Sequence, residues 1–181
     1  MIYSIKGSGN FVNPKRITYT ISQDTTFTQE ILKAGREPKL KYLESKIIQA
    51  DKFISEKLNI KLNEKVLYLE NMRFVDDNSF LFAKYFINIE LIDNYEIFST
   101  TNSISKVYEK YGLEPTRKNS EIDIVSSSNK LKKIFTIQHD LPIVKIATKT
   151  IDKKTNKVID YCFSNFRSDM AKIVVDYKGG N

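Results

Sequence analysis

The sequence predicts an α+β fold built around antiparallel β-strands. Two long stretches have the alternation of β-hairpins: residues 65–90, with a turn at residues 76–78, and residues 141–166, with a turn at residues 153–156. Short helical patterns separate the other strands, and they do not follow the regular strand–helix–strand order of a parallel sheet. The chain has 181 residues, of which 41% are hydrophobic, so it is long enough for one domain with a substantial core.

The N-terminal residues predict a short hairpin. Residues 2–5 and 10–13 can pair as strands, because Gly7 and Gly9 between them tolerate the positive φ angles of a tight turn. The following residues, 15–24, are interpreted as a linker with some alternation of apolar and polar side chains.

Two short helices with an extended strand between them are predicted next. Thr25 or Thr26 caps the first helix, within residues 25–35, and Asp51 caps the second, within residues 51–60. The apolar residues expected to face the core are Phe27, Ile31 and Leu32 in the first helix and Phe53, Ile54 and Leu58 in the second.

The region after the first long hairpin alternates between short helices and strands. Residues 90–98 and 103–112 predict helices, the second of which ends at a glycine. Residues 117–127 predict a strand, residues 128–135 a short helix beginning at a serine cap, and residues 171–177 a final strand.

The chain is basic, with a formal net charge of +7 and a pI near 9.3. This balance favours anionic partners such as nucleic acid or phosphorylated metabolites. The lysines are scattered, however, and usually stand near Asp or Glu, so a solvated surface explains the same count.

Motifs for common chemistry are missing from the sequence. A single cysteine, Cys162, and a single histidine, His139, exclude Cys-rich and His-rich metal sites, and no glycine-rich phosphate loop indicates a cofactor. His139 is interpreted as a solvated loop residue and Cys162 as a buried apolar one. The absence of an internal disulfide fits a reducing cytoplasm, and no apolar run approaches the ~20 residues that cross a bilayer.

The opening IYSIKGSGNFV resembles the wing of GntR-type winged helix-turn-helix repressors, a β-hairpin with a G-x-G tip. Asn10 stands where that family usually has Thr. The resemblance implies that residues 1–14 are the remnant of a DNA-binding domain whose helices are absent. The wing residues expected to contact DNA are Lys6, Gly7, Ser8 and Gly9.

The rest of the chain resembles the UTRA ligand-sensing domain of the HutC branch of these regulators. LYLENMRFVDDNSF is similar to the family's basic strand and turn, with Arg73 kept and Asn71 in place of the other arginine. SISKVYEKYGLEP is similar to the family's serine-initiated helix, and VIDYCFSNFRSDMAKIVV to its acidic and Arg-x-Asp motif. The resemblance implies that residues 25–178 form a chorismate lyase-like fold, with about six antiparallel strands and peripheral helices.

The same resemblance implies the site. The residues expected to bind the effector are Arg73, Tyr85, Ser103, Asp160, Arg167 and Asp169. The effector itself is left open among sugar phosphates, free sugars, amino acids and carboxylates, although the loss of one arginine at Asn71 weakens the case for a sugar phosphate.

A structural role is the alternative for each of these residues. Arg73 alternatively lies on the exposed face of its strand, and Tyr85 in the core. Ser103 is a natural helix cap, although the same geometry makes an anion site. Arg167 and Asp169 share a strand face in the prediction and alternatively form a structural ion pair. Asp160 alternatively pairs with a neighbouring lysine.

The implied function is that of a homodimeric sensor that alters DNA binding by the absent N-terminal domain. A chorismate lyase-like enzyme acting on a small carboxylate is the competing hypothesis, because that enzyme shares the fold. The wing argues against catalysis, since an enzyme has no use for a repressor hairpin.

Overall fold

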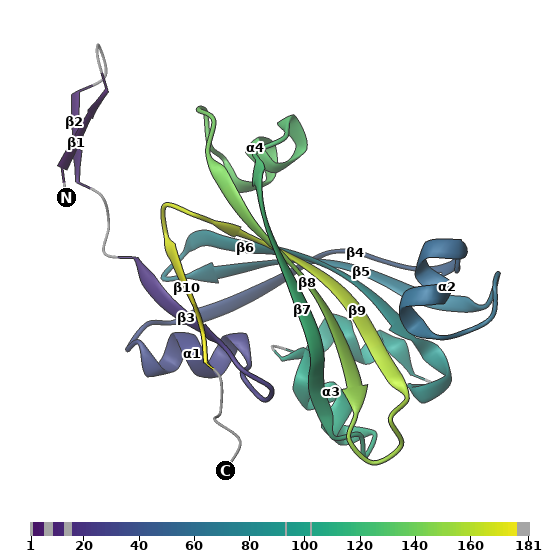
Figure 1. The fold of residues 1–181 in the computed structure, drawn as a ribbon. Helices are drawn as coiled ribbons and strands as arrows, with labels where there is room; N and C mark the ends of the chain where they lie inside the picture. Colours follow the sequence, from purple (N-terminus) through teal and green to yellow (C-terminus); the bar gives the residue numbers. More distant parts are fainter. Residues whose placement is uncertain (1, 6–8, 13–15, 93, 102, 177–181) are drawn as a thin grey trace.

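The core of the molecule is a six-stranded antiparallel sheet. The computed structural model describes residues 2–5, 9–12, 16–92, 94–101 and 103–176. The sheet has the strand order β4-β5-β6-β9-β8-β7 (Figure 1). In that order the strands are Pro38–Gln49, Lys65–Val75, Asn78–Asn88, Val158–Arg167, Pro142–Asp152 and Pro115–Ser126.

The two predicted hairpins form the centre of this sheet. Asp76 and Asp77, both with positive φ, make the turn between β5 and β6, and the turn between β8 and β9 follows Asp152. The hairpins join where β6 pairs antiparallel with β9. The predicted α+β fold with about six antiparallel strands is therefore confirmed.

Helices α2 (Lys52–Leu58) and α4 (Asn129–Phe135) pack on one face of the sheet. Asp51 caps α2 by accepting a hydrogen bond from the Ile54 backbone N–H at 2.8 Å, as predicted. The prediction that Phe53 faces the core is wrong. Phe53 is 44% exposed, although its ring stacks against that of Phe163 on the sheet.

The opposite face is covered at both ends, and the space between the two covers holds the candidate site. Helix α3 (Ile104–Lys110) and the short 3-10 helices Ile89–Leu91 and Tyr95–Thr100 cover one end. Helix α1 (Phe27–Lys33) covers the other end, capped by Thr26. Leu32 was expected in the core but is 58% exposed, whereas Phe27 and Ile31 of the same helix are buried.

A second, two-stranded sheet lies beside α1 and corrects the expectation of a linker at residues 15–24. β3 (Ile17–Ile21) pairs in parallel with β10 (Ala171–Val175), so the strands of the molecule are not all antiparallel. Residues 15–24 therefore include a strand of the domain rather than only a linker. Ile17, Tyr19 and Ile21 alternate toward the core, where the Tyr19 ring contacts Phe166 of β9 with ring centres 4.9 Å apart.

The predicted N-terminal hairpin is present in the backbone. β1 (Ile2–Ile5) pairs antiparallel with β2 (Gly9–Val12). The second strand begins one residue before its predicted range of 10–13. Of the predicted DNA contacts, Gly9 begins β2, whereas residues 6–8 lie outside the described residues.

Candidate functional site

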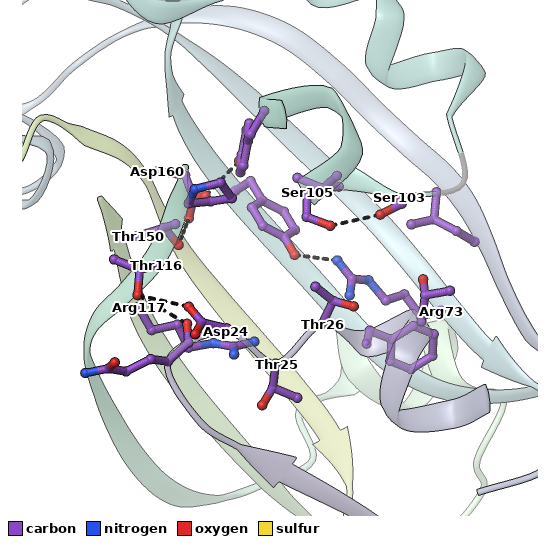
Figure 2. A pocket seen from close by; sticks show the side chains of 18 residues that line it. Asp24, Thr25, Thr26, Arg73, Ser103, Ser105, Thr116, Arg117, Thr150 and Asp160 are labelled. Carbon is purple, nitrogen blue, oxygen red and sulfur yellow. Dashed lines mark hydrogen bonds between the residues drawn. The ribbon is translucent and has the colours of Figure 1, made fainter. Parts of the chain in front are cut away.

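A cavity of about 120 Å³ opens on the sheet face between α1 and α3. Residues 23–28, which connect β3 to α1, form one wall, and residues 103–108, at the start of α3, form another (Figure 2). Side chains from β5, β6, β9, β8 and the start of β7 form the floor. The strands supply the floor because alternate side chains of a strand point to the same face.

Arg73 lies at one end of this floor and is only 9% exposed. Its Nε donates to Oδ1 of Asn71 at 3.3 Å, and its Nη2 donates to the Tyr85 hydroxyl. Its guanidinium carbon lies 5.1 Å from the ring centre of Phe27. In the described part of the chain, no carboxylate forms an ion pair with Arg73. A buried charge without a counter-charge is costly, so an anion in the cavity would stabilise this side chain.

Asn71 occupies the position of the arginine that the family resemblance led us to expect. It is fully buried, and its Nδ2 atom has no hydrogen-bond partner among the described residues. Its Oδ1 orients the Arg73 guanidinium. Asn71 therefore takes the place of a second cation on β5, and it binds the guanidinium of Arg73 instead.

Asp160 lies toward the other end of the floor, on β9, and is 1% exposed. Its carboxylate accepts hydrogen bonds from the Tyr108 hydroxyl at 2.7 Å and from Thr150 Oγ1 at 3.1 Å. Burial raises the pKa of Asp160 to about 6, although these two hydrogen bonds act in the opposite direction. Burial and the nearby Asp160 hold the pKa of Tyr108 well above its usual value, so this phenol remains a donor.

Arg117 lines the same cavity and was not anticipated from the sequence. It lies near the start of β7, where its Nη1 donates to the Ser22 carbonyl at 2.8 Å and its backbone N–H donates to the Gln23 carbonyl at 3.0 Å. Lys153, from the β8–β9 turn, pairs with Asp24 at 2.9 Å. These contacts hold the wall between β3 and α1 against the sheet. The sequence contained no local signal for Arg117, because its position depends on the pairing of β7 with β8.

Ser103 lines the cavity at the N-cap position of α3, as predicted, but it does not make the predicted cap bond. Its Oγ lies 3.0 Å from the Ser105 Oγ, and its backbone N–H donates to Thr101 Oγ1 at 3.2 Å. Both serine hydroxyls therefore belong to the polar wall of the cavity.

Arg167 and Asp169 are not part of the cavity lining. β9 ends at Arg167 and Asp169 lies in the following turn, so the two do not share a strand face as expected. Instead their side chains form an ion pair, with Nη2 and Oδ2 2.7 Å apart and Nε and Oδ1 3.1 Å apart. Arg167 also reaches Ser79 at the start of β6 through its Nη1. Arg167 and Asp169 therefore form the ion pair that was the structural alternative to effector binding.

Of the six predicted effector residues, the structure brings four to one cavity: Arg73, Tyr85, Ser103 and Asp160. Tyr85 faces the cavity, and its neighbour Phe86 packs on the opposite face of the sheet. Cys162 is buried and its pKa is raised to about 12 by burial, whereas His139 is exposed. Within the described residues, no group of three acidic, His or Cys side chains is placed to bind a metal, and no helix is long and apolar enough to cross a membrane.

A family model for the UTRA domain matches residues 33–172. The chain belongs to the UTRA domain family. A relative with 22% identity is the mannosyl-D-glycerate transport/metabolism system repressor MngR of Escherichia coli, which aligns over 98% of this chain and 72% of its own length. The predicted family is therefore confirmed.

Several solved structures share the fold. PhnF of Mycobacterium smegmatis superposes with a TM-score of 0.84 at 13% identity, over 99% of this chain and 79% of PhnF. The effector domain of the same protein superposes with a TM-score of 0.79 at 14% identity, over 90% of this chain and 100% of that domain. A GntR-family transcriptional regulator of Enterococcus faecalis gives a TM-score of 0.68 at 16% identity, over 76% and 99% of the two chains. The molecule thus shares the fold of the PhnF effector domain and of this GntR-family regulator.

Proposed function

We propose that this UTRA domain binds a small anionic metabolite in the cavity and so controls a winged helix-turn-helix domain, as in the HutC branch. In this proposal residues 1–14 belong to the wing of that domain, and Lys6, Gly7, Ser8 and Gly9 contact DNA. Two copies pair, and the effector favours one arrangement of the two DNA-binding domains over another. Such a regulator would act in the cytoplasm.

The single observation that supports an anionic effector is the environment of Arg73. Its guanidinium is buried at the end of a cavity, it contacts aromatic rings and two neutral polar groups, and no described carboxylate pairs with it. Arginine binds carboxylate and phosphate through parallel N–H bonds, and such bonds are strong where water is excluded. The effector would therefore place an acid group on Arg73.

This requirement narrows the four predicted effector classes. A free neutral sugar leaves the Arg73 charge uncompensated, whereas sugar phosphates and carboxylates compensate it. The name of the Escherichia coli relative refers to mannosyl-D-glycerate, a sugar joined to a carboxylic acid. A carboxylate attached to a larger polar group is accordingly a suitable first ligand to test.

Thermal unfolding of the 181-residue chain with a panel of sugar phosphates, sugar acids, amino acids and neutral sugars tests the proposal. A ligand at a hundred times its Kd stabilises the folded state by about 2.7 kcal/mol, which raises Tm by roughly 5–10 °C for a chain of this size. We expect this shift with an anionic ligand in the wild type and its loss in Arg73→Met. Arg167→Met is the matched control, because it removes an arginine that lies outside the cavity lining.

Two results would contradict the proposal. If a neutral sugar shifts Tm as strongly as its phosphate or acid, Arg73 does not select an anion. If mass spectrometry finds that a bound ligand has been converted to product, the chorismate lyase-like alternative replaces the sensor. We expect the ligand to be recovered unchanged.

A further inference from the structure

We propose that the face of the six-stranded sheet opposite the cavity is the surface through which two copies of this chain pair. The contact lies between α2 and α4, and a strip of aromatic rings forms its centre. This inference rests on the proposed function, in which two copies pair, and it deepens that function by naming the surface. The partner is a second copy, so the same patch is used on both sides of a closed dimer.

Helices α2 and α4 leave the middle of this face uncovered. At one end of the strands, α2 packs on Val66, Ala147 and Tyr161, and at the other end α4 packs on Met72 and Phe82. Figure 1 shows the two helices well apart, with strands of the sheet between them. On the cavity side, in contrast, α1, α3 and β3 pack against the strands in two larger clusters of buried side chains. The open stretch between α2 and α4 is therefore available to a partner.

Four aromatic rings cross this open stretch, and we call them the aromatic strip: Phe53, Phe163, Phe86 and Tyr68. Phe53 of α2 stacks on Phe163 of β9, with ring centres 6.2 Å apart. Phe163 contacts Phe86 of β6 at 6.5 Å, and Phe86 contacts Tyr68 of β5 at 5.4 Å. Phe53 is 44% exposed and the other three rings are only partly buried. A contiguous surface of exposed rings marks an interaction site, because aromatic side chains are enriched at the centre of interfaces.

Lysines surround the aromatic strip. The ammonium groups of Lys46, Lys57 and Lys145 lie 5.2, 5.6 and 4.8 Å from the centres of its rings. Two kinds of partner use rings and cations on an open sheet face. Single-stranded nucleic acid stacks its bases on the rings and places its phosphates on the lysines. A protein surface packs its own apolar side chains on the rings.

The charges of this face favour a second copy over nucleic acid. Lys46 pairs with Glu44 at 2.6 Å, and Lys57 pairs with Glu121 at 3.7 Å. Glu70, only 5% exposed, pairs with two further lysines, from β6 and α4, at 3.5 and 3.1 Å. The carboxylates thus neutralise most of the lysine charge around the strip, whereas nucleic acid binding depends on free cations. A surface that presents both signs of charge side by side can be complementary to its own copy.

The face is large enough for a stable contact. Six strands about 4.8 Å apart span about 24 Å, and the eleven residues of β5 span about 36 Å at about 3.3 Å per residue. The product is roughly 900 Å², and a standard interface buries about 800 Å² on each partner. A dimer on this face therefore reaches the size of a specific interface.

Pairing on this face leaves the cavity accessible in both copies. Tyr85 lines the cavity, whereas its neighbour Phe86 belongs to the aromatic strip, because alternate residues of β6 point to opposite faces of the sheet. The cavity and the proposed interface are therefore back to back. A ligand can enter either copy without separating the two, as control of a paired regulator by an effector requires.

The test is sedimentation velocity of the full 181-residue chain from low micromolar to about 100 µM. The first variant is Phe53→Glu, which places a charge at a position that is already 44% exposed and so preserves the fold. The second is Phe163→Glu, at the centre of the aromatic strip. Leu32→Glu is the matched control, because it adds the same charge at a 58% exposed apolar residue of α1, on the cavity side. Thermal unfolding establishes that each variant is folded.

We expect the wild type to form a dimer, and Phe53→Glu to raise its Kd at least about tenfold, because a charge at a central aromatic residue of an interface is desolvated there. Phe163→Glu should raise the Kd further, and Leu32→Glu should match the wild type. A second readout is acylation of lysines, followed by mass spectrometry. Lys145 should react slowly in the dimer and fast in Phe53→Glu. Lys154, whose side chain is 57% exposed in the β8–β9 turn, should react equally in both.

Every other outcome overturns the inference. If the wild type dimerises and neither Phe53→Glu nor Phe163→Glu changes the Kd, the copies pair through another surface. If Leu32→Glu separates them as well, the contact includes the cavity side. If a single-stranded oligonucleotide protects Lys145 while the chain alone does not, the face binds nucleic acid. A wild type that stays monomeric at about 100 µM also removes the pairing step of the proposed function.

The binding of an anion is judged separately, by the Tm shift and its loss in Arg73→Met. A chain that dimerises through the aromatic strip but shows no Tm shift with any anion would retain this inference and reject the proposed effector. A chain with the shift but without this interface would do the reverse. The two proposals therefore fail independently.

Discussion

Asp160→Asn should stabilise the ligand-free protein, and the gain should grow with pH. The side chain is 1% exposed, and burial raises its pKa from 3.8 to about 6. Asparagine is nearly the same size and carries no charge. Its Oδ1 can still accept from Tyr108, and its amide can donate to the Thr150 hydroxyl. The substitution therefore removes the buried charge while keeping the packing.

The magnitude follows from the two pKa values. A carboxyl whose pKa is higher in the folded than in the unfolded state stabilises the fold below pH 3.8, and this contribution is lost as the pH rises through about 6. Across the whole range the loss is about 3 kcal/mol, and between pH 5 and pH 8 it is about 1.4 kcal/mol. The stability of Asp160→Asn relative to the wild type should therefore increase by about 1.4 kcal/mol between these two pH values.

Urea unfolding at pH 5 and at pH 8 measures this difference. Asp152→Asn is the matched control, since hydrogen bonds from the Glu114 and Thr155 backbone lower the pKa of Asp152 against the effect of burial. A lowered pKa contributes stability above the unfolded value and loses it only as the pH falls, so this control should show little change between pH 5 and pH 8. If the free energies of unfolding of Asp160→Asn and the wild type differ by the same amount at both pH values, the reasoning is refuted. Such a result would mean that the charge of Asp160 does not destabilise the folded state.

Two further predictions concern the helices. Asp51→Ala removes the cap of α2 and should lower the free energy of unfolding by about 1 kcal/mol in urea titration; an unchanged midpoint would show that the cap is replaced by water. Phe135→Ala should cost about 3–5 kcal/mol, because this side chain, at the last residue of α4, is 1% exposed. Leu32→Ala, at a 58% exposed position, should stay within about 0.5 kcal/mol of the wild type, and similar losses in both variants would contradict the assigned core.

Turns and most caps were predicted well because they depend on a few consecutive residues, although Ser103 makes no cap bond. Asp51 and Thr26 cap their helices, and the aspartates at residues 76–77 form the turn of the first long hairpin. Helix orientation was predicted less well. Periodicity indicated an apolar stripe on each helix, but Leu32 and Phe53 are 58% and 44% exposed, because the exposure of a helical residue depends on the segments that pack against the helix.

The sequence predicted the residues of the candidate site only in part. Arg73, Ser103 and Asp160 were selected by their match to family motifs, and the structure brings them to one cavity together with Tyr85. The same match also selected Arg167, which the structure joins to its neighbour in the turn instead. A motif match gives the residue type at each position of the chain. It does not give the direction in which a side chain points, and that direction decides whether the residue lines the cavity.

The amino-acid sequence by itself determined the local elements: two long hairpins, short capped helices and the alternation that buries one side of each strand. Only the tertiary structure decided that β3 pairs in parallel with β10, and that Arg117 lies in one row with Thr150 and Asp160. The physical reason is the range of the interactions. Turns and caps form between residues a few positions apart, whereas strand order and register depend on contacts between segments far apart in the chain, where the burial of whole faces selects the pairing.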